Sequence, residues 1–102
     1  MFVLQIAGNK HWRIYDTPVE RPFRGQDFTP EKFTAGDLTM EFDLHPGDMV
    51  YVPRGVMHEA TSSDESCHIT LGILPTSWTD LLLEAVARVG LDDAELRRSL
   101  PP

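Results

Sequence analysis

The chain has 102 residues, which limits it to a single domain, and a domain of this size can bury a core without disulfides. Sixteen acidic residues against nine basic ones give a formal charge of −7. This charge repels phosphate backbones and anionic lipid surfaces, so the composition argues against direct binding of nucleic acid.

Two further features bear on the compartment. Cys67 is the single cysteine, so no intrachain disulfide can form, and we expect a reducing, cytoplasmic location in which this thiol packs within a strand. No apolar run reaches the roughly 18 residues that span a bilayer, so no membrane partner is expected.

The chain opens directly on strand-like residues, so we expect that the start of the domain is missing from this sequence.

Alternation of polar and apolar side chains predicts strands along the first three quarters of the chain. The turn signal Gly8-Asn9 between the first two strands predicts a hairpin. The Pro- and Gly-rich segment 16–36 predicts a long loop that serves as a lid or binding segment or is loosely ordered. The predicted strands are residues 2–7, 11–15, 38–44, 49–52, 56–61 and 67–74.

After Pro75 the apolar period changes to 3.6 residues, which predicts a helix that is capped by Ser77, with Asp80 three positions on, and ends at Gly90. A second capping box, Asp92 with Glu95, predicts a short helix through residue 100. The apolar stripe of the longer helix is either core or an interface, and it consists of Trp78, Leu82, Val86 and Val89.

The spacing G-x5-P-x-G-x2-H, formed by Gly47, Pro53, Gly55 and His58, is typical of the second motif of cupin barrels. It predicts a turn that delivers His58 into a barrel mouth as a metal ligand. The alternative for an isolated histidine is a packed or solvated side chain. One histidine cannot hold a catalytic metal, so further ligands would be needed.

Other polar residues remain open between two interpretations. Lys10 is either an exposed hairpin lysine or an interior ammonium that binds the carboxylate of an organic acid. Asp43 and His45 share a strand face and could be ligands, but the turn at Pro46 favours the exposed end of a hairpin. The polar residues of the last strand could line a cavity or face solvent, and they are His68, Thr70 and Gly72. No residue is assigned a catalytic role.

Several segments in the same order resemble the JmjC-type cupin family, which includes the ribosomal oxygenases. They cover residues 2–15, 44–58, 68–73 and 77–82. The resemblance implies a mostly β fold, a partial double-stranded β-helix of the cupin or jelly-roll type, followed by a short C-terminal helical segment. Residues 1–75 would be the distal part of the barrel, and residues 76–102 the start of a helical dimerisation region, so a homodimer is expected.

The same resemblance implies an oxygenase that depends on Fe(II) and 2-oxoglutarate and hydroxylates a protein side chain, in bacterial members on a ribosomal protein. His58 matches the family's distal iron-binding histidine, and Lys10 matches the basic residue that binds the far carboxylate of 2-oxoglutarate. Gly72 stands where some members carry a serine that assists this carboxylate.

The family's H-x-D motif, which supplies the other two iron ligands, falls just before residue 1. We therefore expect a fragment truncated after this motif, inactive by itself. The alternative hypothesis is a non-catalytic cupin-like module that binds a partner or dimerises.

Overall fold

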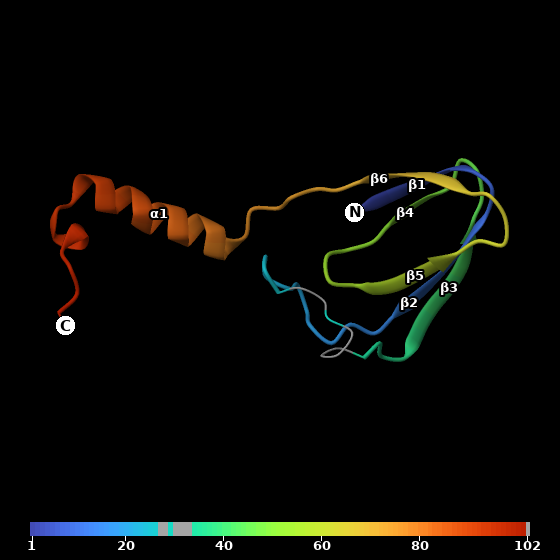
Figure 1. The fold of residues 1–102 in the computed structure, drawn as a ribbon, viewed down its shortest axis with the longest axis horizontal. Helices are drawn as coiled ribbons and strands as arrows, with labels where there is room; N and C mark the ends of the chain where they lie inside the picture. The colour runs from blue at the N-terminus through green and yellow to red at the C-terminus, as the bar shows by residue number, and fades with distance from the viewer. Residues whose placement is uncertain (27–28, 30–33, 102) are drawn as a thin grey trace. The chain divides into compact units, whose positions relative to one another are not determined.

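The computed structural model describes residues 1–26, 29 and 34–101. In this part of the chain, six strands precede one α-helix and one short 3-10 helix (Figure 1). They are β1 (Phe2–Ala7), β2 (Lys10–Tyr15), β3 (Leu38–Leu44), β4 (Met49–Tyr51), β5 (Met57–Thr61), β6 (Cys67–Leu71), α1 (Trp78–Asp92) and η1 (Glu95–Arg97). The predicted fold class, a partial double-stranded β-helix followed by a helical segment, is confirmed.

The described strands form two antiparallel three-stranded sheets, with orders β4-β1-β6 and β3-β2-β5. Figure 1 shows the two sheets as two layers. Among these strands, only β2 and β3 are both consecutive and paired, so each of the other connections passes from one sheet to the other. This alternation is the jelly-roll arrangement.

The predicted hairpin of the first two strands is therefore wrong, because β1 and β2 belong to different sheets. Gly8 makes the crossing possible, with a φ of +66°. A Cβ atom at this position would lie 2.2 Å from the Glu65 carbonyl oxygen, in the connection between β5 and β6. The two connections meet so closely that a side chain has no room.

The hydrophobic core lies between the sheets and is small. Val3 and Val52 come from the layer of β1 and β4, and Trp12 and Leu44 come from the layer of β2 and β3. All four are at most 5% exposed. Because side chains alternate along a strand, these residues identify the inner face of each sheet.

The outer face of the β4-β1-β6 sheet is apolar and exposed. Between 37% and 62% of each side chain is accessible at Leu4, Ile6, Met49, Tyr51, Ile69 and Leu71. The inner face of β1 and β6 instead carries polar residues, including the fully buried Gln5. Polar side chains are uncommon in an interior that serves packing alone, so the space between the layers is a candidate binding site.

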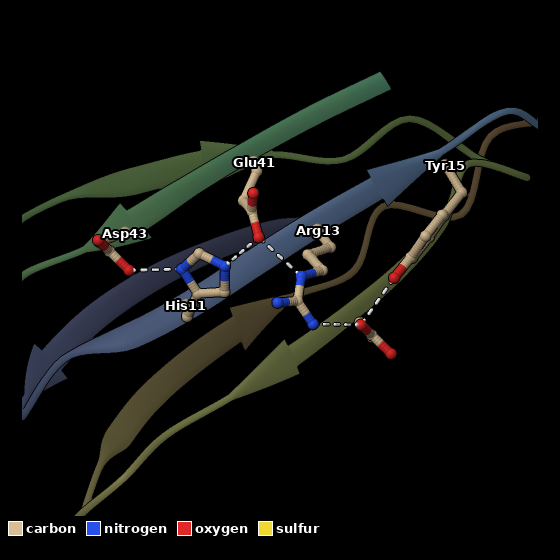
Figure 2. Close-up of polar contacts among 6 residues, drawn as sticks. His11, Arg13, Tyr15, Glu41 and Asp43 are labelled. Carbon is tan, nitrogen blue, oxygen red and sulfur yellow. Dashed lines mark hydrogen bonds and ion pairs between the residues drawn. The ribbon is translucent and has the colours of Figure 1, made fainter. Parts of the chain in front are cut away.

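The outer face of the β3-β2-β5 sheet carries a ladder of ion pairs across its three strands (Figure 2). His11 lies 2.7 Å from both Asp43 and Glu41, and Arg13 Nε donates to the same Glu41 oxygen at 2.7 Å. Arg13 and the Tyr15 hydroxyl also both donate to Glu59. The ladder pairs the polar groups of the three outward side chains of β2. The alternate residues of this strand, Lys10, Trp12 and Ile14, therefore lie on its inner face.

These hydrogen bonds shift the pKa values of the ladder residues. Hydrogen bonds to Glu41 and then Asp43 raise the pKa of His11 above 6.5. Arg13 and then His11 lower the pKa of Glu41, and Tyr15 and then Arg13 lower the pKa of Glu59. The imidazolium and both carboxylates are therefore stabilised in their charged forms.

The turn that leads into β5 is packed against the loop after β2. Gly55 has a φ of +89°, and a Cβ there would lie 2.4 Å from Pro22 Cδ. The predicted loop 16–36 extends over residues 27, 28 and 30–33, which lie outside the described residues. Its described part contains no helix or strand and lies against the turn that delivers His58.

The chain divides into two compact units, Met1–Gly72 and Ile73–Pro102. In the second unit, the predicted Ser77 cap is confirmed, since Ser77 Oγ accepts from Asp80 N at 3.1 Å and Ser77 N donates to Asp80. No residue of α1 is buried, and its apolar stripe is at least half exposed at each position.

Several predicted boundaries are wrong. The helix passes Gly90 and ends at Asp92, because the Asp93 N–H still bonds to the Val89 carbonyl. The Asp92 capping box does not form, and η1 begins after Ala94 with Asp93 Oδ1 accepting from Glu95 N. β6 ends at Leu71 rather than at residue 74, and Cys67 is exposed on its outer face rather than packed.

No helix among the described residues combines the length and the apolar character that crossing a membrane requires.

Candidate functional site

The inner face of the β3-β2-β5 sheet brings Lys10 and His58 onto one surface. Trp12 is 3% exposed and belongs to the core, so Lys10, two residues before it, shares its face of β2. His58 is paired with Ile14, two residues after Trp12, and shares the same face. Both residues singled out from the sequence therefore lie on the wall between the sheets.

His58 is oriented by two contacts. Its ring stacks on Trp12, with ring centroids 5.6 Å apart and an interplanar angle of 22°. Its Nδ1 lies 2.9 Å from the Val56 carbonyl oxygen, which can only accept, so Nδ1 carries the proton. The lone pair is then on Nε2, which is the tautomer that a metal-binding histidine adopts when its other nitrogen donates to a carbonyl.

The His58 side chain nevertheless remains exposed, because β5 is at the edge of its sheet among the described strands. One neighbour, Trp12, is buried and has an indole Nε1 without a hydrogen-bond partner in the described residues. A buried N–H without a partner is uncommon and costs free energy. This wall therefore offers an unused donor beside an unused imidazole nitrogen.

Lys10 reaches across to the other sheet. Its Nζ lies 3.0 Å from Nδ1 of His68 on β6, and the contact is partly buried. No carboxylate of the described residues forms an ion pair with Lys10. The positive charge of Lys10 is therefore not compensated by a carboxylate of the described residues. A partly buried ammonium in this state can bind an anionic ligand.

The position of the last strand resolves an alternative that the sequence left open. His68 and Thr70 are paired with Gln5 and Val3, both fully buried, so they lie on the inner face. Gly72 lies just beyond β6. His68 is half-buried on this inner face, whereas Thr70 on the same face and Gly72 remain exposed.

The other candidate ligands lie elsewhere. Asp43 is on the outer face, where Figure 2 shows it beside His11. His45 is 62% exposed and interacts with Asp48. Within the described ranges, no group of three or more His, Cys, Asp and Glu residues could hold a metal ion. His58 fits one position of a metal site, and the described residues do not supply the rest.

Sequence reasoning missed two contacts of this site, the stacking of His58 on Trp12 and the bond from Lys10 to His68. Strand alternation does place Trp12 on the face of Lys10. The contact to His68, however, depends on how the two sheets face each other, and no local pattern contains that information.

Comparison with known proteins gives a consistent result. The family model described as "JmjC domain" matches residues 1–81. Ribosomal oxygenase 2 of Bos taurus is 35% identical over 109 residues, which cover 99% of this chain and 23% of that protein.

Two other relatives have similar identities to this chain. The bifunctional lysine-specific demethylase and histidyl-hydroxylase NO66 of Culex quinquefasciatus is 35% identical over 98% of this chain and 17% of its own length. Ribosomal oxygenase 1 of Danio rerio is 34% identical over 98% of this chain and 20% of its own length. The chain thus spans about a fifth of the length of these relatives.

Proposed function

Because the chain belongs to the JmjC domain family, we propose that it forms part of an Fe(II)- and 2-oxoglutarate-dependent oxygenase that hydroxylates a protein side chain. The observation that carries this proposal is the ammonium of Lys10, which lies between the sheets without a carboxylate partner in the described residues. Such a group fits the far carboxylate of a dicarboxylic acid.

The roles of the residues follow from their positions on the wall. At a rise of about 3.4 Å per residue, Lys10 and Ile14 are about 14 Å apart along β2, and His58 lies beside Ile14. Two long side chains and a five-carbon dicarboxylate together span this length. Lys10 would bind the far carboxylate, and His58 would present Nε2 to the metal end.

Trp12 would form the floor between these two positions. Its indole ring would hold the His58 imidazole nearly parallel to itself, and the buried indole would shield this part of the wall from water. When bound, iron with 2-oxoglutarate supplies the oxidising chemistry, and the protein positions the reactants.

The isolated chain is proposed to be inactive. His58 is one ligand, and the described residues bring no further His, Cys, Asp or Glu close enough to complete a metal site. Metal affinity falls steeply with the number of ligands, so the donors that complete the site would have to come from outside these residues.

The proposed partner is a protein substrate, for which a ribosomal protein is the first candidate, since the relatives include ribosomal oxygenases. The charge of −7 and the single cysteine support a cytoplasmic protein without direct contact to nucleic acid or membranes.

A second candidate function is a non-catalytic cupin-like module that binds a partner or dimerises. The exposed apolar outer face of the β4-β1-β6 sheet and the exposed stripe of α1 favour it. In this proposal, residues 1–75 remain the distal part of the barrel, and residues 76–102 begin a helical dimerisation region that forms a homodimer.

Calorimetric titration with 2-oxoglutarate distinguishes the two candidates. The proposed oxygenase wall requires that the chain bind 2-oxoglutarate and that Lys10→Met weaken binding by about tenfold or more, the worth of a charge-assisted hydrogen bond. Arg13→Gln is the matched control, because it removes a cation from the opposite face of the same strand. Equal affinity in the Lys10→Met and wild-type proteins would contradict the proposal.

A further inference from the structure

The contact between Lys10 and His68 joins residues 58 positions apart in the chain and connects the two sheets. An ammonium has three N–H groups and no lone pair, so Lys10 must be the donor and Nδ1 of His68 the acceptor. His68 is therefore neutral in this contact, with its ring proton on Nε2. The direction of the hydrogen bond fixes both the tautomer and the position of the Lys10 Nζ.

The end of the interior that holds this contact is tied together by Gln5, which is fully buried and pairs with His68. Gln5 Nε2 donates to the carbonyls of Ala7 and Gly8, each at 2.9 Å, and to Ser66 Oγ at 3.0 Å. These bonds link the β1–β2 connection to the residue before β6. His68 thus stands on a strand that is held in register, opposite the start of β2.

The chemistry of the acceptor matters for what Lys10 can do. A carboxylate in place of His68 would neutralise the ammonium and compete with an acidic ligand. An apolar residue would leave the long lysine side chain free to sample many rotamers. A neutral imidazole avoids both effects, since it directs one N–H and leaves the net charge and two N–H groups available.

We propose that His68 is a positioning residue that holds the Lys10 ammonium at the end of the interior for the far carboxylate of 2-oxoglutarate. The inference rests on the proposed function of Lys10 and adds the residue that orients it.

The test uses the 102-residue chain, 2-oxoglutarate as the probe, and 2-oxobutyrate, which lacks the far carboxylate, as the control ligand. His68→Leu removes the acceptor and is expected to weaken 2-oxoglutarate binding by about tenfold, with no change for 2-oxobutyrate. His68→Asn places an amide oxygen near the position of Nδ1 and is expected to restore most of the affinity. His68→Asp introduces a competing carboxylate and is expected to bind 2-oxoglutarate no better than the leucine variant.

A second readout needs no ligand. The NMR signals of the Lys10 Nζ and Cε are expected to shift in His68→Leu and to return towards wild-type positions in His68→Asn, whereas a purely structural role would not produce this rescue. If the leucine variant does not fold, the aspartate variant decides the question, and wild-type affinity in that variant overturns the inference.

The outcomes separate the two levels of the argument. If the wild-type chain does not bind 2-oxoglutarate, the proposed function itself fails. If wild type binds, Lys10→Met loses affinity, and His68→Leu binds as wild type does, the role of Lys10 stands and the role of His68 is refuted.

Discussion

The turn before His58 offers a sharp test of how this site is built. Gly55 has a φ of +89°, and an added Cβ would lie 2.4 Å from Pro22 Cδ and 3.0 Å from Pro22 Cγ. Gly47 has a similar φ of +95°, but no atom lies within 4 Å of its Cβ position. The two glycines therefore differ in crowding and hardly at all in φ.

Substitution by alanine separates the two contributions. Gly47→Ala should lower the free energy of unfolding by about 1–2 kcal/mol, the cost of placing an ordinary residue in the left-handed region. Gly55→Ala carries this same cost and about 1–3 kcal/mol more, because the loop after β2 must move to accommodate the new methyl group. The expected total of about 2–5 kcal/mol is a large part of the stability of a small domain.

A double-mutant cycle isolates the contact. Pro22→Ala removes both crowding atoms, so it should recover about 1–2 kcal/mol of the Gly55→Ala penalty while leaving the Gly47→Ala penalty unchanged. Urea denaturation followed by circular dichroism gives each free energy of unfolding. Equal penalties at Gly55 and Gly47, or no coupling between positions 55 and 22, would refute the packing of this loop against the turn.

Three further predictions concern charge, association and activity. The raised pKa of His11 means that its contribution to stability is complete below pH 6.5 and is lost as pH rises through the folded-state value, whereas the lowered pKa of Glu41 gives a contribution that is present above pH 4.5 and lost as pH falls. The urea midpoint should therefore be highest between these values. His11→Gln should flatten the alkaline side and should also weaken the acid side somewhat, because His11 is the second cause of the lowered Glu41 pKa after Arg13; an unchanged alkaline side in this variant would exclude the ladder. Tyr51→Lys on the apolar outer face should reduce self-association in sedimentation velocity, whereas Thr61→Lys on the other sheet should not, and equal behaviour would argue against that face as an interface. With saturating Fe(II) and 2-oxoglutarate, the chain should produce succinate at the background rate, and robust production would contradict its proposed inactivity.

The sequence predicted most of the strands because alternation is a local property, and residues 38–44 show it clearly. It failed where pairing is decided by the whole fold. Gly8-Asn9 is a good hairpin signal, yet this turn changes sheets, because the close approach of Glu65 depends on the return of the chain 57 residues later. Helix ends were misplaced by two residues at α1 and by three at η1, which is close to the ordinary uncertainty of such boundaries.

The candidate site also combines a residue that a local pattern predicts with contacts that only the whole fold determines. A spacing motif singles out His58 as a candidate ligand, because a tight turn and the residue after it form one local unit; its metal binding stays a prediction. Lys10 could not be distinguished from an exposed lysine, since its surroundings are provided by β6, and the importance of His68 followed only from that contact. Alternation also could not tell whether the apolar face of β1 and β6 is covered, and the structure places Leu4, Ile69 and Leu71 on an exposed outer face.

The central claim is that Lys10, Trp12 and His58 line one wall that receives 2-oxoglutarate. The most direct measurement is the set of intermolecular nuclear Overhauser effects between the methylene protons of 2-oxoglutarate and the isotope-labelled chain. The account predicts contacts from the ligand to the Trp12 indole and to the Lys10 Cε protons, with none to Arg13 on the opposite face of the same strand. Contacts to the outer face, or a bound ligand without contacts to Trp12 and Lys10, would contradict it.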